Sequence, residues 1–274
     1  MQKYYTRACN FYYNKISREK VKKKISLPVS GNKSFSFDTI EIITRTNKKK
    51  INIRSIKNLP SKIKKKVLID INNISKPKKI PKLKLENLPI FMGVLNITPD
   101  SFSDGGKFNL KNKGIIHAKQ MYKSGANIID VGGESTRPGS KTVNPETEWR
   151  RVKFIIEKFK KKYKKTCLSI DTRKSDLMIK SIKNGVDLIN DVSGFNYDQN
   201  ALSKLKKYNI AKVFHHMKGT PNTMQKNPKY KNVLLDIYDF FEKNIKDFDN
   251  KKIILDPGIG FGKNLKHNLT LISK

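Results

Sequence analysis

The stretch GVLNITPDSFSDGG occupies residues 93–106. Its first part continues the apolar run Ile90–Leu95, which is typical of a buried β-strand. The run ends at Asn96 and opens into a polar loop that contains one aromatic residue, Phe102, and closes on a glycine pair. A strand that ends in an amide and leads into such a loop is suited to holding a ligand. Further segments downstream repeat this pattern.

Apolar runs alternate with lysine-rich amphipathic stretches from residue 88 onward. The predicted strands are 90–95, 127–131, 167–171, 186–191, 211–216 and 252–256. The predicted helices are 111–124, 147–163, 174–184, 198–207 and about 230–247. Near-continuous apolar strands separated by helices indicate a parallel sheet that is covered on both faces. No Rossmann-type phosphate loop follows the first strand, so the pattern favours an α/β fold of the (β/α)8 TIM-barrel type. We expect about six of the eight βα units, because the sequence reaches Lys274 as a sixth helix begins.

Each predicted strand ends in a polar residue. These residues are Asn96, Asp130, Asp171, Asn190 with Asp191, His216 and Asp256. In a barrel, the strand ends meet at the C-terminal mouth, where active sites lie. Any one of them could be a buried and satisfied polar group, but a whole set predicts a shared pocket. Carboxylate acceptors with an amide suit a flat heterocycle that carries several N–H groups, such as an aminopyrimidinone.

Two glycine-containing loops follow strands at the same mouth. The segment 132–140 supplies hydroxyl groups and Arg137, which suit a phosphate or a carboxylate. The segment 256–264 supplies Phe261, which could stack on a ring, and Lys263, which could meet an anion. Glycine-rich loops are weak evidence alone, because most are turns.

Six segments together resemble dihydropteroate synthases, in the same order and at similar spacing. They are GVLNITPDSFSDGG, IIDVGGESTRPGS, SIDTRK, LINDVSG, HHMKGTPNTMQ and LDPGIGFGKN, and they cover residues from about 88 to 274. The resemblance implies a pterin-binding TIM barrel. It implies an enzyme, a transferase of folate biosynthesis, that joins 7,8-dihydropterin-6-ylmethyl diphosphate to 4-aminobenzoate and releases diphosphate. It also implies that sulfonamides compete with the aminobenzoate.

The resemblance also implies roles for individual residues. Pterin binding is expected for Asp171, Asn190, Asp256, Met217, Gly260 and Phe261. The loops that handle the diphosphate and the aminobenzoate are expected to use Thr136, Arg137, Phe102 and Pro138. Asn96 is expected to meet the diphosphate and its Mg²⁺, the implied metal cofactor. Asp130 and Asp100 are expected to support these groups. No residue is assigned as an acid or a base.

The sequence departs from this family in one respect. The family's Ser-Arg-Lys motif on a seventh strand and its Arg-x-His motif on an eighth are both missing, so we expect a barrel truncated at its C-terminal end. An inactive fragment of the enzyme is therefore one alternative. A pterin-dependent methyltetrahydrofolate methyltransferase is a second, although the PDSFSDGG and ESTRPG loops favour the synthase.

Residues 1–86 form a basic extension that differs from the barrel region 87–274. By count, 24 Lys or Arg stand against five Asp or Glu, and segments 34–45 and 51–56 predict a β-hairpin. Residues 65–74 predict a strand or a short helix, and 75–89 a linker. A nucleic-acid-binding protein acting through 1–86 is the alternative from another class. We disfavour it, because only eight of the 59 basic residues in the chain are Arg, and Arg is the preferred residue for bidentate base contacts.

The remaining composition narrows the class of protein. The net charge is +36, and the two cysteines, Cys9 and Cys167, give no disulfide or metal-site spacing. No apolar run is long enough for a membrane span, and the N-terminus has no apolar signal core. We therefore expect a cytoplasmic protein whose partners are small-molecule substrates, with a homodimer left open.

Overall fold

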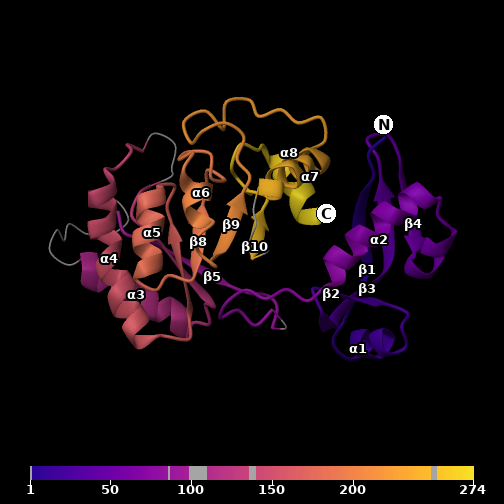
Figure 1. The fold of residues 1–274 in the computed structure, drawn as a ribbon, viewed down its shortest axis with the longest axis horizontal. Helices are drawn as coiled ribbons and strands as arrows, with labels where there is room; N and C mark the ends of the chain where they lie inside the picture. The colour runs from indigo at the N-terminus through magenta and orange to yellow at the C-terminus, as the bar shows by residue number, and fades with distance from the viewer. Residues whose placement is uncertain (1, 86, 99–109, 136–139, 248–251) are drawn as a thin grey trace. The chain divides into compact units, whose positions relative to one another are not determined.

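A computed structural model describes residues 2–85, 87–98, 110–135, 140–247 and 252–274. The chain divides into two compact units. The first comprises Met1–Lys79 with Lys84–Leu88, and the second comprises Ile80–Leu83 with Pro89–Lys274 (Figure 1). No helix in the described part of the chain is long and apolar enough to cross a bilayer.

The second unit is built on a parallel sheet of six strands, each paired with the next along the chain. The strands are β5 (Met92–Asn96), β6 (Ile128–Gly132), β7 (Cys167–Asp171), β8 (Leu188–Asp191), β9 (Ala211–His215) and β10 (Ile253–Asp256). This strand order, in which neighbours in sequence are neighbours in the sheet, is the order of a TIM barrel. The predicted fold class, with six βα units described, is confirmed.

Helices follow the strands and cover one face of this sheet (Figure 1). They are α3 (Leu110–Lys123), α4 (Pro145–Lys162), α5 (Ser175–Lys183), α6 (Ala201–Leu205), α7 (Val233–Asn244), the 3-10 turn η3 (Ile245–Asp247) and α8 (Leu265–Ser273). Helix α4 shows why they form. The Asn144 side chain accepts a hydrogen bond from the Glu146 amide, Pro145 occupies the first turn, and three lysines lie in the last turn. These features satisfy the open amides and complement the helix dipole.

Strand alternation divides the side chains of the sheet into two sets. Ile129, Val131 and Ile170 are fully buried in the core between the sheet and the helices. The residues between them in sequence project to the opposite, inner face of the sheet. This alternation decides which of the predicted polar residues can share a site.

The first unit has an antiparallel sheet and its own core. Its elements are β1 (Tyr5–Tyr13), α1 (Asn14–Lys22), β2 (Leu27–Val29), β3 (Asn32–Ile43), β4 (Lys48–Asn52), the 3-10 helix η1 (Ile53–Asn58) and α2 (Ser61–Ser75). Strand β3 pairs antiparallel with β1, β2 and β4. Phe37, Ile40 and Val67 are fully buried in its core. Residues 65–74, for which a strand and a helix were both open, are helical.

The segment predicted as a linker contains a short part that belongs to the second unit. Within Ile80–Leu83, Lys82 forms an ion pair with Asp187, with Nζ 2.8 Å from Oδ1. Lys160 of α4 also pairs with Asp187, which directly precedes β8. Residues 80–83 therefore lie at the N-terminal ends of the strands, at the end of the sheet remote from the expected site.

Candidate active site

Three of the predicted site residues lie in one layer at the C-terminal end of the sheet. The register pairs Asn96 with Gly132, Gly132 with Asp171, and Asp171 with Asn190. Residues in register on neighbouring parallel strands point to the same face. A side chain at Gly132 would begin 3.0 Å from Asn96 Oδ1 and 3.6 Å from Asp171 Oδ2. The absence of a side chain at Gly132 therefore lets the Asn96 and Asp171 side chains lie close to this position.

A buried carboxylate supports this layer from below. Asp130, two residues before Gly132 on β6, is 2% exposed. Its Oδ2 accepts a hydrogen bond of 2.8 Å from Asn190 Nδ2. This contact fixes the Asn190 amide, because its nitrogen is directed to Asp130 and its oxygen is turned away. Burial raises the pKa of Asp130.

The electrostatics of the layer centre on Asp171. Burial, followed by the negative charges of Asp130 and Asp191, raises the pKa of the Asp171 carboxyl well above its ordinary value. A carboxyl in this environment gains from any ligand that brings hydrogen-bond donors to it. Perturbed carboxyl groups of this kind are common at binding and catalytic sites.

Asp256 ends β10 and pairs in register with His215 of β9. Its Oδ1 accepts a hydrogen bond of 2.7 Å from the Gly258 amide, and its Oδ2 lies 4.0 Å from His215 Nε2. His215 Nδ1 donates to the Val192 carbonyl at 2.7 Å, which fixes the ring. Burial lowers the pKa of His215, which favours the neutral ring. The Asp256 side chain is 44% exposed and accessible to a ligand.

Two residues expected at the mouth face the helices instead. Asp191 is fully buried and accepts hydrogen bonds from the Ser193 and Phe195 amides at 2.7 and 3.1 Å. The His216 ring meets the Phe240 ring of α7 edge-on, with ring centres 4.7 Å apart. The expectation that every strand-end residue points to one mouth was wrong for these two, because adjacent residues of a strand project to opposite faces.

Lys263 does not reach toward an anion. It is 3% exposed, and its Nζ donates to Gly258 O at 2.9 Å and Phe261 O at 2.8 Å, and lies 3.1 Å from His216 Nδ1. Burial lowers its pKa to about 8. The amine therefore holds the loop after β10 in shape, which corrects the expected role.

Three further predicted residues lie in the loops after β9 and β10. The Phe261 ring packs edge-on against His215, with centres 4.8 Å apart. Gly260 adopts a left-handed conformation with φ +84°, and its amide donates to Asn268 Oδ1 at 2.9 Å. Met217 is half-buried directly after His216. Phe261 thus lies beside the Asp256–His215 pair.

The other predicted residues fall in segments that the structure does not describe. They are Phe102, Thr136, Arg137, Pro138 and the supporting residue Asp100. Of the residues that it does describe, no three His, Cys, Asp or Glu side chains gather closely enough to hold a metal ion by themselves.

Comparison with known proteins identifies the family. The family of pterin binding enzymes matches residues 92–274. The chain is 40% identical over 191 residues to the dihydropteroate synthase of Escherichia coli (strain K12), covering 68% of this chain and 67% of the relative. The chain belongs to the dihydropteroate synthase family.

Solved structures of dihydropteroate synthases share the fold. The Yersinia pestis enzyme in a sulfonamide drug complex superimposes with a TM-score of 0.65 at 40% identity, covering 70% of both chains. The Xanthomonas albilineans enzyme in complex with 7,8-dihydropteroate gives a TM-score of 0.60 at 30% identity, covering 70% of this chain and 68% of that one. The chain is therefore an enzyme of the transferase class.

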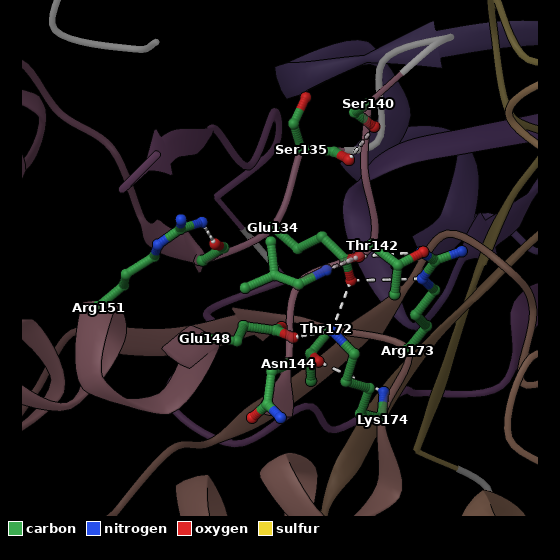
Figure 2. A network of polar contacts seen from close by, with 12 residues as sticks. Glu134, Ser135, Ser140, Thr142, Asn144, Glu148, Arg151, Thr172, Arg173 and Lys174 are labelled. Atoms are coloured by element: carbon green, nitrogen blue, oxygen red, sulfur yellow. Dashed lines mark hydrogen bonds and ion pairs between the residues drawn. The ribbon is translucent and has the colours of Figure 1, made fainter. Parts of the chain in front are cut away.

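One polar network of this dihydropteroate synthase family member was not predicted from the sequence. Glu134 lies at the centre of a polar network with Arg173 and Lys174, and Lys174 also pairs with Glu148 (Figure 2). The signal was present, because an acidic residue follows β6 and two basic residues follow the adjacent β7. Charges of opposite sign after neighbouring strands can meet, and both motifs had already been singled out.

Proposed function

We propose that Asp171, Asn190 and Asp256 bind the pterin ring of 7,8-dihydropterin-6-ylmethyl diphosphate, which the chain joins to 4-aminobenzoate. The observation that carries this proposal is the layer formed by Asn96, Gly132, Asp171 and Asn190. It presents hydrogen-bonding groups side by side on one face of the sheet. A pterin ring carries several N–H groups along one edge, and these match carboxylate and amide oxygens.

The orientation of Asn190 sharpens the proposal. Because its nitrogen donates to Asp130, its oxygen is the group left to accept a hydrogen bond from a ligand. Asp171 and Asp256 add carboxylate oxygens. The three residues together form an acceptor-rich surface, which suits a ring edge that consists of donors. Met217, Gly260 and Phe261 would line the same pocket.

The reaction exchanges one bond at the methylene carbon of the pterin. The carbon–oxygen bond to the diphosphate breaks, and the diphosphate leaves with the electron pair. The amine nitrogen of 4-aminobenzoate forms the new carbon–nitrogen bond and releases one proton to solvent. A neutral arylamine does not need a strong base. The role of the protein is to hold the two substrates in line.

Asn96 fits the expected Mg²⁺ in a limited way. Mg²⁺ commonly takes one or two protein oxygens and completes its shell with water and substrate phosphates. Asn96 Oδ1 is such an oxygen, and it lies beside Gly132 in the same layer as Asp171. We propose that Asn96 holds a diphosphate-bound Mg²⁺, which would neutralise the charge of the leaving group.

We assign the residues that contact the diphosphate and the aminobenzoate by family resemblance. Thr136 and Arg137 would contact the diphosphate and the aminobenzoate, and Phe102 and Pro138 would cover the aminobenzoate ring. These four lie outside the described residues, so their roles are carried by the sequence motifs alone.

The variant Asp171→Asn tests the pterin site. It replaces an acceptor with a group that also donates, so we expect the dissociation constant for a 7,8-dihydropterin, measured by calorimetry, to rise at least tenfold, or ~1.4 kcal/mol. Asp176→Asn is the matched control, because that carboxylate is 77% exposed and pairs with Lys204 on the outer helices. Equal affinities in all three proteins would refute the assignment.

A further inference from the structure

Glu134 connects the segments that follow two adjacent strands. It lies two residues after the end of β6, and it is 6% exposed. Its Oε1 lies 2.9 Å from Arg173 Nη2, and its Oε2 lies 2.8 Å from Lys174 Nζ (Figure 2). Both cations belong to the segment between β7 and α5. One carboxylate therefore holds together the places where the chain leaves β6 and β7.

The same carboxylate also holds the returning end of the β6 loop. The Val143 amide donates to Glu134 Oε1 at 3.0 Å, and Arg173 Nη2 donates to Thr142 Oγ1 at 3.2 Å. A further bond of 2.6 Å runs from Ser140 Oγ to Ser135 O. The outgoing and returning ends of the segment are thus joined to each other and to the segment after β7.

The burial of these charges makes their geometry demanding. Glu148 is fully buried and Lys174 is 6% exposed, and Lys174 bridges Glu148 and Glu134. The charges of the two carboxylates, Glu134 and Glu148, and of the two cations, Arg173 and Lys174, sum to zero. Removing one charge from a buried network is costly, because its partner is left without compensation. The Arg173 guanidinium is further held over the Tyr197 ring, 4.0 Å from its centre.

We propose that Glu134 is a positioning residue, which fixes the stem of the loop after β6, residues 133–135 and 140–143, through Arg173 and Lys174. By fixing this stem, Glu134 aligns the diphosphate end of the substrate with the pterin-binding layer. This inference rests on the proposed function. Glu134 itself is bonded to protein groups and is directed to the neighbouring loop stem. Ser135 and Ser140, which are joined by the bond from Ser140 Oγ to Ser135 O, lie on the stem that it holds, and backbone amides of such a loop suit a phosphate.

The proposal separates two parts of substrate binding. Asp171 and Asn190 are held in place by the register of β7 and β8, and Asn190 also by its bond to Asp130. The Glu134 charge reaches Asp171 only as the smallest of the charges that raise its pKa, so the positions of both residues are set without Glu134. Loss of the Glu134 charge should therefore loosen the stem and weaken diphosphate binding, while the pterin ring is still held. A purely structural role would instead weaken all binding together or none.

The test compares Glu134→Gln with Glu146→Gln in the full chain. Gln keeps the size of the side chain and removes its charge. Glu146 is a matched control, because its side chain is 65% exposed and pairs with Lys180 outside the network. The rate of hydrogen exchange at the Val143 amide reports how firmly the stem is held, because this amide donates to Glu134. Calorimetry reports the dissociation constants of the dihydropterin diphosphate with Mg²⁺ and of the same pterin with a free hydroxymethyl group.

For Glu134→Gln we expect about tenfold faster exchange at Val143, since charge-assisted hydrogen bonds are roughly twice as strong as neutral ones. We expect the dissociation constant of the diphosphate ester to rise about tenfold, and that of the free hydroxymethyl pterin to stay within about twofold. Arg173→Lys keeps a positive charge but loses the planar guanidinium with its several donors. It should give a smaller rise in the dissociation constant of the diphosphate ester. Glu146→Gln should match the unmodified chain.

The outcomes are distinct. Unchanged exchange at Val143, or faster exchange with an unchanged ratio of the two dissociation constants, overturns the positioning role. Equal loss for both ligands overturns it as well, because the pterin site would then share the dependence. Failure of the unmodified chain to bind the free hydroxymethyl pterin would refute the proposed function instead.

Discussion

Asn190 on β8 donates a hydrogen bond of 2.8 Å to Asp130 on β6, across the intervening strand β7. The bond runs over the inner face of the sheet, because both side chains project to that face. It couples a deeply buried carboxylate to a residue of the candidate pterin site. The state of Asp130 should therefore influence ligand binding without contact between Asp130 and the ligand.

The variant Asp130→Leu tests this coupling. The side chain is similar in size but cannot accept the bond from Asn190, so the Asn190 amide is free to turn its nitrogen toward the ligand. We expect the dissociation constant for a dihydropterin to rise at least tenfold, because a hydrogen bond to a charged group contributes ~1.5–3 kcal/mol. Calorimetry measures it, with a thermal melt to show that the variant is folded. An unaltered dissociation constant in a folded variant would show that Asn190 keeps its orientation unaided.

The affinity for the pterin should depend on pH through Asp171. Burial and the charge of Asp130 raise its pKa well above the usual value, so the carboxyl gains a proton at a higher pH than an ordinary aspartate, near 3.9. The ionised form is the better acceptor for the ring N–H groups. We therefore expect affinity to fall as the pH falls through this raised pKa, and Asp130→Asn to move the midpoint to lower pH. Calorimetric titrations across pH test both statements. A midpoint that Asp130→Asn leaves in place would count against the coupling.

Gly132 should not tolerate a side chain without loss of function. A methyl group there would lie 3.0 Å from Asn96 Oδ1, closer than most real contacts, and 3.6 Å from Asp171 Oδ2. We expect Gly132→Ala to displace Asn96 and to weaken binding of the diphosphate ester with Mg²⁺ at least fivefold, or ~1 kcal/mol. The measurement is calorimetry with and without Mg²⁺. If the variant retains the full Mg²⁺-dependent gain in affinity, Asn96 is not the metal contact.

Lys263 should make stability depend on pH in the alkaline range. Burial lowers its folded-state pKa to about 8, whereas an unfolded lysine titrates near 10.4. Between these values the unfolded chain binds more protons, so the free energy of unfolding should rise with pH by up to roughly 3 kcal/mol. Lys212, whose pKa is also lowered by burial to about 8, adds a rise of its own. Denaturant titrations of the chain and of Lys263→Met should therefore differ in slope across this window. Parallel curves would show that Lys263 stays protonated.

The first unit should be dispensable for pterin binding. We propose that residues 1–86 are an appendage outside the site. Its apolar core, including Phe37, Ile40 and Val67, consists of its own residues. A chain that begins at Lys79 keeps Ile80–Leu83, which groups with the second unit, and the ion pair of Lys82 with Asp187. We expect its dihydropterin dissociation constant to stay within about twofold of the full chain, by calorimetry. A chain that begins at Pro89 lacks that ion pair and should melt at a lower temperature. Loss of binding in the first of these proteins would place part of the site in the appendage.

Hydrophobic patterning predicted the strands of the second unit closely. The run 167–171 coincides with β7, and 127–131 differs from β6 by one residue at each end. Continuous apolar runs are a strong signal here because strand residues on both faces are buried, although helices cover only one face. Ile129 and Ile170 are buried on the helix side, and Ile128 and Cys167 on the other. The predicted helix 198–207 shortens to α6, Ala201–Leu205, because short helices have weak caps and ends that patterning does not define.

Patterning could not predict which polar residues share the site. Asn190 and Asp191 are adjacent and equally polar, yet only Asn190 faces the inner side, and the strand register decides this. The role of Lys263 could not be predicted from the sequence either, because its partner His216 is 47 positions away. Glu134 and Arg173 are 39 positions apart, and their pairing depends on the adjacency of β6 and β7. Contacts between residues so far apart in sequence depend on which strands are neighbours in the sheet. A single sequence predicts the fold class but not these individual contacts.

Two residues of the proposed pterin site also stabilise the protein itself. Asp256 holds the turn at Gly258, and Asn190 is tied to Asp130, so a change that repels a ligand also disturbs the protein. An inhibitor confined to the space bounded by Asp171, Asn190 and Asp256 would therefore leave few substitutions by which the enzyme could escape it. Compounds that rely on the exposed loops would meet a larger set of tolerated changes, and resistance to them should arise more readily.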